Sequence, residues 1–189
     1  MSDKRKYIQY ATRYLISPHF DHVLEFGVAA GKSMKIIKEE LDKKEKKYNI
    51  FGFDSFEGLQ EDWITPDGNI LLKKGTFSTK GVTPNIPDVV WFEGWFEDTI
   101  PDYLKIAQPI ALLHIDCDQY KPAREILYGL KDFIVENTII AIDDWFYGNN
   151  SKYNDTTQKA FNEWITDFNI IYKFHKFPGR DSQKIVEVL

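Results

Sequence analysis

Residues 110–118 read IALLHIDCD, a run of six strand-like residues, five of them apolar, followed by two aspartates. A nearly continuous apolar run is typical of a central strand that is buried on both faces of a parallel sheet. Asp116 follows the run directly, and Asp118 follows two residues later. The stretch therefore predicts a parallel α/β sheet that carries acidic groups at the carboxyl end of one central strand.

The chain on both sides of this run alternates short apolar segments with amphipathic ones, the pattern of strands and covering helices. We expect strands over residues 22–26, 48–53, 89–92, 110–115 and 138–142, and a closing pair over 169–177 and 183–189. The turn Pro178-Gly179-Arg180-Asp181 predicts that this closing pair forms a hairpin. Helices are expected from about residue 33, over 97–106, over 122–134 with Pro122 in the first turn, and over about 155–165.

The organisation of the chain is simple. It shows no repeat, no low-complexity segment and no linker, so residues 1–189 are expected to form one domain. Residues 55–88 are rich in glycine and proline and predict a long irregular segment. A loop of that length in a compact domain is usually functional.

Composition excludes several classes of protein. The net charge of −5 argues against a nucleic-acid partner, which would need a basic face. No apolar run is long enough to cross a bilayer, and the polar N-terminus, Met1–Tyr10, lacks the apolar core of a secretory signal. The single cysteine, Cys117, fits a reducing compartment. We therefore expect a cytoplasmic protein with no membrane contact, and the oligomeric state stays open, a homo-oligomer included.

The ends of the five predicted parallel strands are the most informative positions. Each strand is followed by a polar or glycine residue: Gly27, Asp54, Glu93-Gly94, Asp116 and Asp143. In an open parallel sheet the carboxyl ends of all strands lie on one edge, and ligands bind there. The acidic groups are therefore expected to converge on a single cleft.

The first strand ends in a glycine turn, residues 25–31, which read EFGVAAG. Two glycines around a tight strand-to-helix turn let a ligand approach the backbone, and Asp54 is placed to accept hydrogen bonds from a ribose. Ala29 stands where a dinucleotide fingerprint needs glycine, which favours a ligand without pyrophosphate. The simpler interpretation is a tight turn with an acidic cap. A phosphate-binding loop is disfavoured, because it needs four residues between its glycines and this turn has three.

The aspartate pairs after the fourth and fifth strands predict a metal site. Carboxylates crowded into one cleft repel each other unless a positive charge lies among them. Oxygen ligands favour Mg²⁺, Mn²⁺ or Ca²⁺ over zinc. The alternative is that these acids cap the following helices, which explains one acid at each strand end but not two. His114 is interpreted as a core histidine, and Trp145 and Tyr147 either form a substrate wall or pack in the core.

Several blocks in a fixed order resemble a known family. They are residues 24–28 (LEFGV), 52–59 (GFDSFEGL), 94–101 (GWFEDTIP), 114–120 (HIDCDQY) and 143–145 (DDW). The set resembles the macrocin O-methyltransferase family, whose members methylate sugar hydroxyls on antibiotics and related molecules. The resemblance implies a Rossmann-like class I methyltransferase fold, a mostly parallel seven-stranded sheet with an antiparallel last strand.

The resemblance also implies roles for individual residues. Those expected to bind S-adenosylmethionine are Glu25, Gly27 and Gly31 at its methionine end, Asp54 and Ser55 at its ribose, and Gly94, Trp95 and Phe96 at its adenine. Those expected to bind Mg²⁺ (or Mn²⁺) are Asp116, Asp143 and Asp144. Asp118 is the expected general base, and Lys121 is the alternative base. Two features depart from the family: the short chain before the first strand, which leaves a family-like N-terminal lid in question, and Lys121, where a small or acidic residue is more common.

These expectations combine into one function. The sequence predicts an S-adenosylmethionine-dependent, divalent-metal-dependent O-methyltransferase that acts on a small polyhydroxy acceptor with vicinal hydroxyls, a sugar or glycosylated metabolite. One alternative is a metal-dependent glycosyltransferase, because residues 116–118 also match an Asp-x-Asp motif. The other is a non-catalytic S-adenosylmethionine-binding protein.

Overall fold

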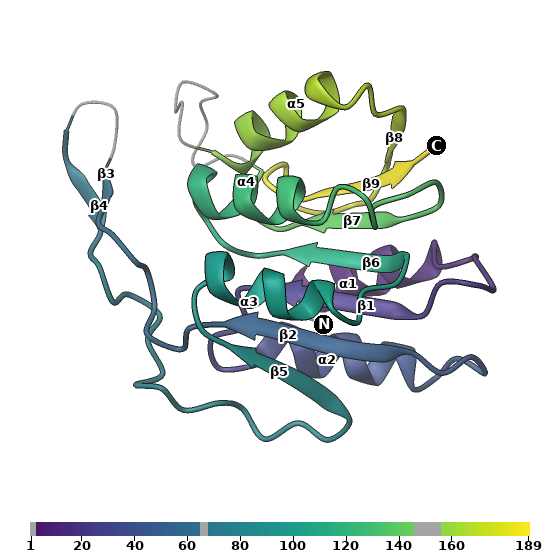
Figure 1. Cartoon of the computed structure of the whole chain (residues 1–189), viewed down its shortest axis with the longest axis horizontal. Coiled ribbons are helices and arrows are strands. Elements are labelled where there is room, and N and C mark those ends of the chain that lie inside the picture. The colour runs from purple at the N-terminus through teal and green to yellow at the C-terminus, as the bar shows by residue number, and fades with distance from the viewer. Residues whose placement is uncertain (1–2, 65–67, 146–155) are drawn as a thin grey trace.

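A computed structural model describes residues 3–64, 68–145 and 156–189. Within these residues a seven-stranded sheet has the order β5-β2-β1-β6-β7-β9-β8. Its strands are β1 (His22–Phe26), β2 (Asn49–Asp54), β5 (Val89–Glu93), β6 (Ile110–Ile115), β7 (Ile139–Ile142), β8 (Tyr172–His175) and β9 (Lys184–Val188). The helices are α1 (Asp3–Arg13), α2 (Lys32–Leu41), α3 (Phe96–Leu104), α4 (Tyr120–Gly129) and α5 (Thr157–Asp167). Figure 1 shows α3, α4 and α5 on one face of the sheet and α1 and α2 on the other.

The strand directions confirm the predicted fold. The pairs β1–β2, β1–β6, β2–β5 and β6–β7 are parallel. Only β9 runs antiparallel among the sheet's described strands, since it is antiparallel to both β7 and β8. The chain order reverses at β1, whose neighbours are β2 and β6. In open α/β sheets this switch point is where ligands bind, at the carboxyl ends of the strands.

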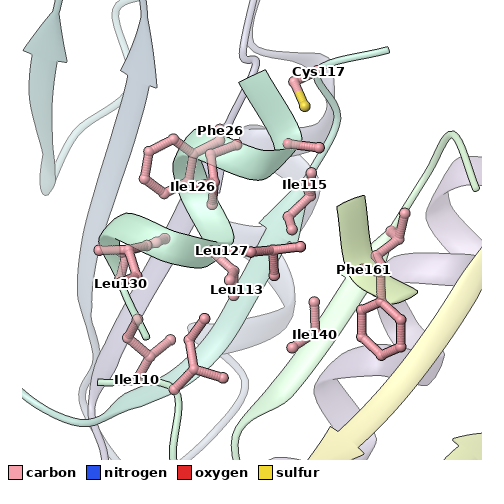
Figure 2. Close-up of a cluster of buried hydrophobic side chains, with 14 of the residues drawn as sticks. Phe26, Ile110, Leu113, Ile115, Cys117, Ile126, Leu127, Leu130, Ile140 and Phe161 are labelled. Atoms are coloured by element: carbon pink, nitrogen blue, oxygen red, sulfur yellow. The ribbon is translucent and has the colours of Figure 1, made fainter. Parts of the chain in front are cut away.

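Two apolar layers fill the space between the sheet and the helices. One lies under α3, α4 and α5 and includes Phe26, Leu113 and Phe161 (Figure 2). The other lies under α1 and α2 and includes Tyr7, Met34 and Ile37. The six residues of β6 are all buried, as expected for a central strand whose side chains alternate between two covered faces.

The structure corrects the bounds of several predicted elements. The helix predicted to run to residue 134 ends at Gly129, and the turns that follow bring Leu130 and Ile134 into the core. The apolar spacing of these two residues therefore reflects their burial in the core and does not indicate that the helix continues. Pro122 is the third residue of α4, within the first turn as predicted, where a missing N–H costs nothing. The predicted start of the last helix, Asp155, lies outside the described residues.

Three elements, two short strands and a helix, are absent from the sequence predictions. The segment expected to be irregular contains a short antiparallel hairpin, β3 (Trp63–Ile64) with β4 (Ile70–Leu72), which projects away from the sheet in Figure 1. The N-terminal segment forms α1, an amphipathic helix that buries Tyr7, Ile8 and Ala11 against the sheet. None of the helices in the described part of the chain is long and apolar enough to span a membrane.

Candidate active site

The switch point brings the glycine turn and the first acidic group together. The backbone N–H of Asp116 donates to the carbonyl oxygen of Phe26, 2.9 Å away. Gly27 has a φ of +85°, and a Cβ atom at this position would overlap the carbonyl oxygen of Asp116. Glycine is therefore required here both for its backbone conformation and for the close approach of the chain after β6.

A cavity of about 730 Å³ opens along this edge of the sheet. That size is within the range of small-molecule and cofactor sites. Ten of the residues predicted for the site line it: Gly27, Asp54, Ser55, Trp95, Phe96, Asp116, Asp118, Lys121, Asp143 and Asp144. The expectation that the strand ends converge on one cleft is therefore met by the fold.

Three other residues predicted to bind the cofactor, Glu25, Gly31 and Gly94, are not among the residues that line the cavity. Gly31 precedes α2 with a φ of +74° and packs against Pro84. Gly94 donates its backbone N–H to the carbonyl oxygen of Asp54 at 3.0 Å. Both support the cavity-lining segments, and their direct contact with a cofactor stays a prediction.

Glu25 is fully buried, and its Oε1 lies 2.9 Å from Nδ1 of His114 on the neighbouring strand. The Oε2 atom of Glu25 and Nε2 of His114 have no hydrogen-bond partner among the described residues. Burial lowers the pKa of His114, but the hydrogen bond and charge of Glu25 outweigh it, so the net shift is upward. The pair lies in the core beside the site, as expected for His114, and a cofactor role for Glu25 stays a prediction.

Asp54, at the end of β2, holds the glycine turn. Its Oδ2 accepts hydrogen bonds from the backbone N–H groups of Val28 and Ala29, each at 2.7 Å, and its Oδ1 accepts from Phe56 at 2.6 Å. The same carboxylate lines the cavity. Since each carboxylate oxygen has two lone pairs, Asp54 retains capacity to accept a ligand hydroxyl.

The aspartates after β6 and β7 form one cluster. Asp143 donates its backbone N–H to the carbonyl oxygen of Ile115 at 3.0 Å, which places it beside Asp116. One carboxylate oxygen from each of Asp116, Asp143 and Asp144 lies within 4.8 Å of the others. Asp118 follows with a left-handed φ of +65° and also lines the cavity.

A lysine ammonium, which the sequence did not predict, lies in this cluster. The ammonium of Lys4, from the first turn of α1, is 2.5 Å from Oδ2 of Asp116 and 2.9 Å from Oδ2 of Asp143. Burial lowers the pKa of Lys4, but the two carboxylates raise it by more, so the ammonium stays charged. The available signal was the helical spacing of Tyr7, Ile8 and Ala11, which predicts a helix that carries Lys4 at its start.

Two further polar groups reach Asp143 from the turn between β8 and β9. Gln183 donates from its Nε2 to Oδ1 of Asp143, and Nη2 of Arg180 is 4.0 Å from the same oxygen. This turn lies at the carboxyl edge because β8 runs parallel to β7 and only β9 is reversed among these strands. The sequence predicted the turn but not its contact with the site.

The carboxylates remain electrostatically crowded. Burial and then the charge of Asp116 raise the pKa of Asp118 to about 7. Burial, followed by the charges of Asp118 and Asp116, raises the pKa of Asp144 to about 9. Burial opposes ionisation of Asp143 too, but Lys4 and His114 outweigh it and lower the pKa of that carboxyl. One ammonium therefore balances only part of the negative charge.

The donor set fits a hard divalent cation. Mg²⁺ prefers oxygen ligands at about 2.0–2.1 Å, so opposite ligands lie about 4.2 Å apart. The carboxylate oxygens of Asp116, Asp143 and Asp144 lie within 4.8 Å of one another, close to that spacing. The residues present therefore fit Mg²⁺ or Mn²⁺.

Trp145 is a core residue. It is 5% exposed and packs edge-to-face against Phe161 and Phe174. It is not among the described residues that line the cavity. Of the two interpretations left open by the sequence, core packing is the one the structure shows; Tyr147 lies outside the described residues.

The family of the chain follows from a profile of methyltransferase domains, which matches residues 24–145. This chain belongs to the methyltransferase domain family. The match covers the glycine turn, Asp54 and all four clustered aspartates. It favours methyl transfer over the glycosyltransferase alternative. No match to this methyltransferase was found among curated protein sequences.

Solved structures share the fold of this methyltransferase at low sequence identity. CalS11, a calicheamicin methyltransferase, has a TM-score of 0.74 and 20% identity over 95% of this chain and 76% of its own. The O-methyltransferase NovP has a TM-score of 0.68 and 18% identity over 98% of this chain and 79% of its own. An O-methyltransferase from Bacillus cereus in complex with SAH has a TM-score of 0.65 and 12% identity, covering 100% of this chain and 81% of its own. The class I methyltransferase fold is confirmed, and the narrower macrocin-type assignment stays a prediction.

Proposed function

We propose that this methyltransferase transfers a methyl group from S-adenosylmethionine to a hydroxyl of a small polyhydroxy acceptor, a sugar or glycosylated metabolite, with the help of Mg²⁺ or Mn²⁺. One observation carries the proposal. The carboxylate oxygens of Asp116, Asp143 and Asp144 lie within 4.8 Å of one another in the same cavity as the glycine turn. A cation bound to this acidic cluster, next to a cofactor at the glycine turn, would be placed to activate an oxygen nucleophile.

The cofactor is assigned to the part of the cavity around β1 and β2. Gly27 lines the cavity at the turn, Asp54 and Ser55 offer oxygen acceptors for the ribose hydroxyls, and Trp95 and Phe96 follow the end of β5 for the adenine. In this arrangement the sulfonium faces the acidic half of the cavity, whose negative charge favours a cation. The structural neighbour from Bacillus cereus is described with bound SAH, which supports the choice of cofactor.

The reaction moves one methyl carbon from sulfur to oxygen. The C–S bond breaks, its electron pair stays on sulfur, and the new C–O bond forms with an oxygen lone pair. A divalent cation bound to Asp116, Asp143 and Asp144 would supply the positive charge that acidifies and orients a hydroxyl. Asp118 lines the same cavity and accepts the hydroxyl proton, and Lys121 is the alternative acceptor. Burial raises the pKa of Asp118, which strengthens its carboxylate as a base, whereas a cation bound to the neighbouring aspartates would lower that pKa.

The acceptor class rests on the polar character of the acidic half of the cavity. Two vicinal hydroxyls suit an oxygen-coordinated cation that exchanges its water ligands. One structural neighbour, CalS11, is described as a TDP-rhamnose 3'-O-methyltransferase, which supports a sugar as acceptor. No role in the proposal falls to Trp145, because this side chain packs in the core.

A methyl-transfer screen tests the proposal. Labelled S-adenosylmethionine is incubated with the protein, Mg²⁺ and a panel of free sugars, nucleotide sugars and glycosides, with DNA, RNA and protein as comparison acceptors. We expect label only in the hydroxylated small molecules. Transfer restricted to a macromolecule would overturn the acceptor class. SAH binding without transfer to any acceptor would favour the non-catalytic alternative.

A further inference from the structure

Lys4 reaches the carboxylate cluster from outside the sheet. Its ammonium lies 2.5 Å from Oδ2 of Asp116 and 2.9 Å from Oδ2 of Asp143, two of the three proposed metal ligands. These two aspartates follow neighbouring strands, so the ammonium bridges β6 and β7. A lysine thus supplies a positive charge at the place where the proposed cation would bind.

The backbone of Lys4 is held in place by the packing of α1, whereas its side chain is partly exposed to solvent. Tyr7 and Ile8 are buried in the layer beneath α1, and the Tyr7 hydroxyl donates to the carbonyl oxygen of Lys184 at 3.3 Å. These contacts hold the first turn of α1 at the cavity edge. The Lys4 side chain itself is 28% exposed, and its four-carbon stem can rotate toward solvent without movement of the helix.

Both oxygens of Asp143 are already occupied. Oδ2 pairs with Lys4, and Oδ1 accepts a hydrogen bond from the buried amide of Gln183. A metal bound to Asp143 must therefore share or replace one of these partners. The amide is neutral and compatible with a nearby cation, whereas an ammonium and a divalent cation a few ångströms apart repel each other strongly.

We propose that Lys4 is an intramolecular counter-ion that competes with the divalent metal for Asp116 and Asp143. The ammonium neutralises the cluster before the metal binds, and metal entry turns the Lys4 side chain outward. The inference rests on the proposed function, because it assumes the metal site. Under this competition, the apparent metal affinity is the intrinsic affinity multiplied by the fraction of molecules in which Lys4 has left the site. The N-terminal helix, which carries Lys4, therefore influences how tightly the metal binds.

Metal binding to matched variants tests the proposal. Mn²⁺ titrations followed by electron paramagnetic resonance compare the metal-stripped wild type with Lys4→Met and Lys6→Met at one pH. Lys6 is an exposed lysine of the same helix, so its variant carries the same charge change away from the site. We expect Mn²⁺ to bind Lys4→Met at least about tenfold more tightly, a difference of roughly 1.4 kcal/mol, and Lys6→Met like the wild type. Lys4→Gln, which keeps a hydrogen-bond donor without the charge, is expected to follow Lys4→Met.

Thermal unfolding gives a second readout that needs no substrate. Without metal, Lys4→Met should unfold at a lower temperature than Lys6→Met, and Mn²⁺ should raise its Tm by more than it raises that of the wild type. If Mn²⁺ binds the wild type as tightly as it binds folded Lys4→Met and Lys4→Gln, or more tightly, the competition is wrong and the proposed function stands. If Mn²⁺ binds none of these proteins, the metal requirement itself is wrong and the competition falls with it.

Discussion

The carboxylate of Asp54 accepts a hydrogen bond of 2.7 Å from the backbone N–H of Ala29, so the end of β2 holds the turn that follows β1. Val28 donates to the same oxygen, and Asp54 also lines the cavity. One side chain therefore shapes the turn and faces the proposed ribose site. Cofactor binding should be more sensitive to this residue than a single ligand contact would suggest.

Asp54→Asn should weaken SAH binding. A hydrogen bond to a charged acceptor contributes about 1.5–3 kcal/mol, which corresponds to roughly 10- to 150-fold in Kd. Titration calorimetry of SAH measures the change. Glu57→Gln, a charge-matched change at a nearby exposed side chain, serves as the control and should bind SAH like the wild type. Equal affinity in Asp54→Asn would remove Asp54 from the cofactor site.

Asp118→Asn should lower the rate of methyl transfer by a factor of about 10²–10⁴ while SAH and Mn²⁺ still bind, because the variant loses the proton acceptor and keeps the proposed ligands. The wild-type rate should rise with pH as the Asp118 carboxyl ionises, at a pH below the value of about 7 that burial and the charge of Asp116 give this group without metal, because a bound cation lowers the pKa of a nearby carboxyl. Lys121→Met separates the two candidate bases. A larger loss in Lys121→Met than in Asp118→Asn, with the pH dependence abolished only by the lysine change, would reverse the assignment.

Metal-free protein should lose stability as the pH rises. Asp118 and Asp144 have folded-state pKa values of about 7 and about 9, above the value of about 3.9 for an unfolded aspartate. Since the folded state then holds more protons, their contribution to stability is full below about pH 4 and is lost as the pH rises through 7 to 9. Tm measured in EDTA from pH 6 to 9 should therefore fall, and Mg²⁺ should reduce the fall.

The matched variants for this pH series are Asp144→Asn and Glu136→Gln. The first removes the group with the largest upward shift among the clustered aspartates and should flatten the decline. Glu136→Gln removes one negative charge at an exposed position and should leave the decline of Tm with pH unchanged. Parallel declines in all three proteins would show that the crowding of the cluster does not govern the pH dependence.

Gly27→Ala should destabilise the protein more than Gly81→Ala. Both glycines have left-handed φ values, +85° and +74°, so both variants carry similar backbone strain. Only at position 27 would the added methyl overlap backbone, that of Asp116, whereas position 81 has no neighbour within 4 Å. The difference in free energy of unfolding, measured with urea, should be about 1–3 kcal/mol. Equal losses would show that strain alone explains the glycine.

The sheet and the acidic edge were predictable because each depends on local signals. Buried strands such as β6 read as apolar runs, and the residue after each strand must lie at the same edge. The predicted bounds of β6, residues 110–115, agree with the structure, and those of β1 do so too. The helix after β6 was predicted to be too long because Leu130 and Ile134 are buried in the turns that follow it. Apolar periodicity cannot distinguish residues buried in a turn from residues buried in a helix.

The partners of the acidic cluster were not predictable in the same way. Lys4 lies 112 residues from Asp116 in the chain, and Gln183 lies 40 residues from Asp143. Such contacts depend on how α1 and the β8–β9 turn pack against the sheet. The sequence predicted a positive charge among the aspartates and assigned it to a metal; the structure shows the ammonium of Lys4 there, and the metal stays a prediction.

The metal dependence of methyl transfer tests the central claim most directly. Transfer from S-adenosylmethionine to an accepted sugar is measured before EDTA, after EDTA, and after addition of Mg²⁺ or Mn²⁺, in the wild type and in Asp143→Asn, with SAH affinity followed in parallel. The account predicts loss of transfer in EDTA, recovery with either metal, and an inactive Asp143→Asn whose SAH affinity is nearly unchanged, because the proposed cofactor contacts lie at the carboxyl ends of β1, β2 and β5 and in the segments that follow them. Full activity in EDTA together with full activity in Asp143→Asn would contradict it and leave the carboxylate cluster with a structural role alone.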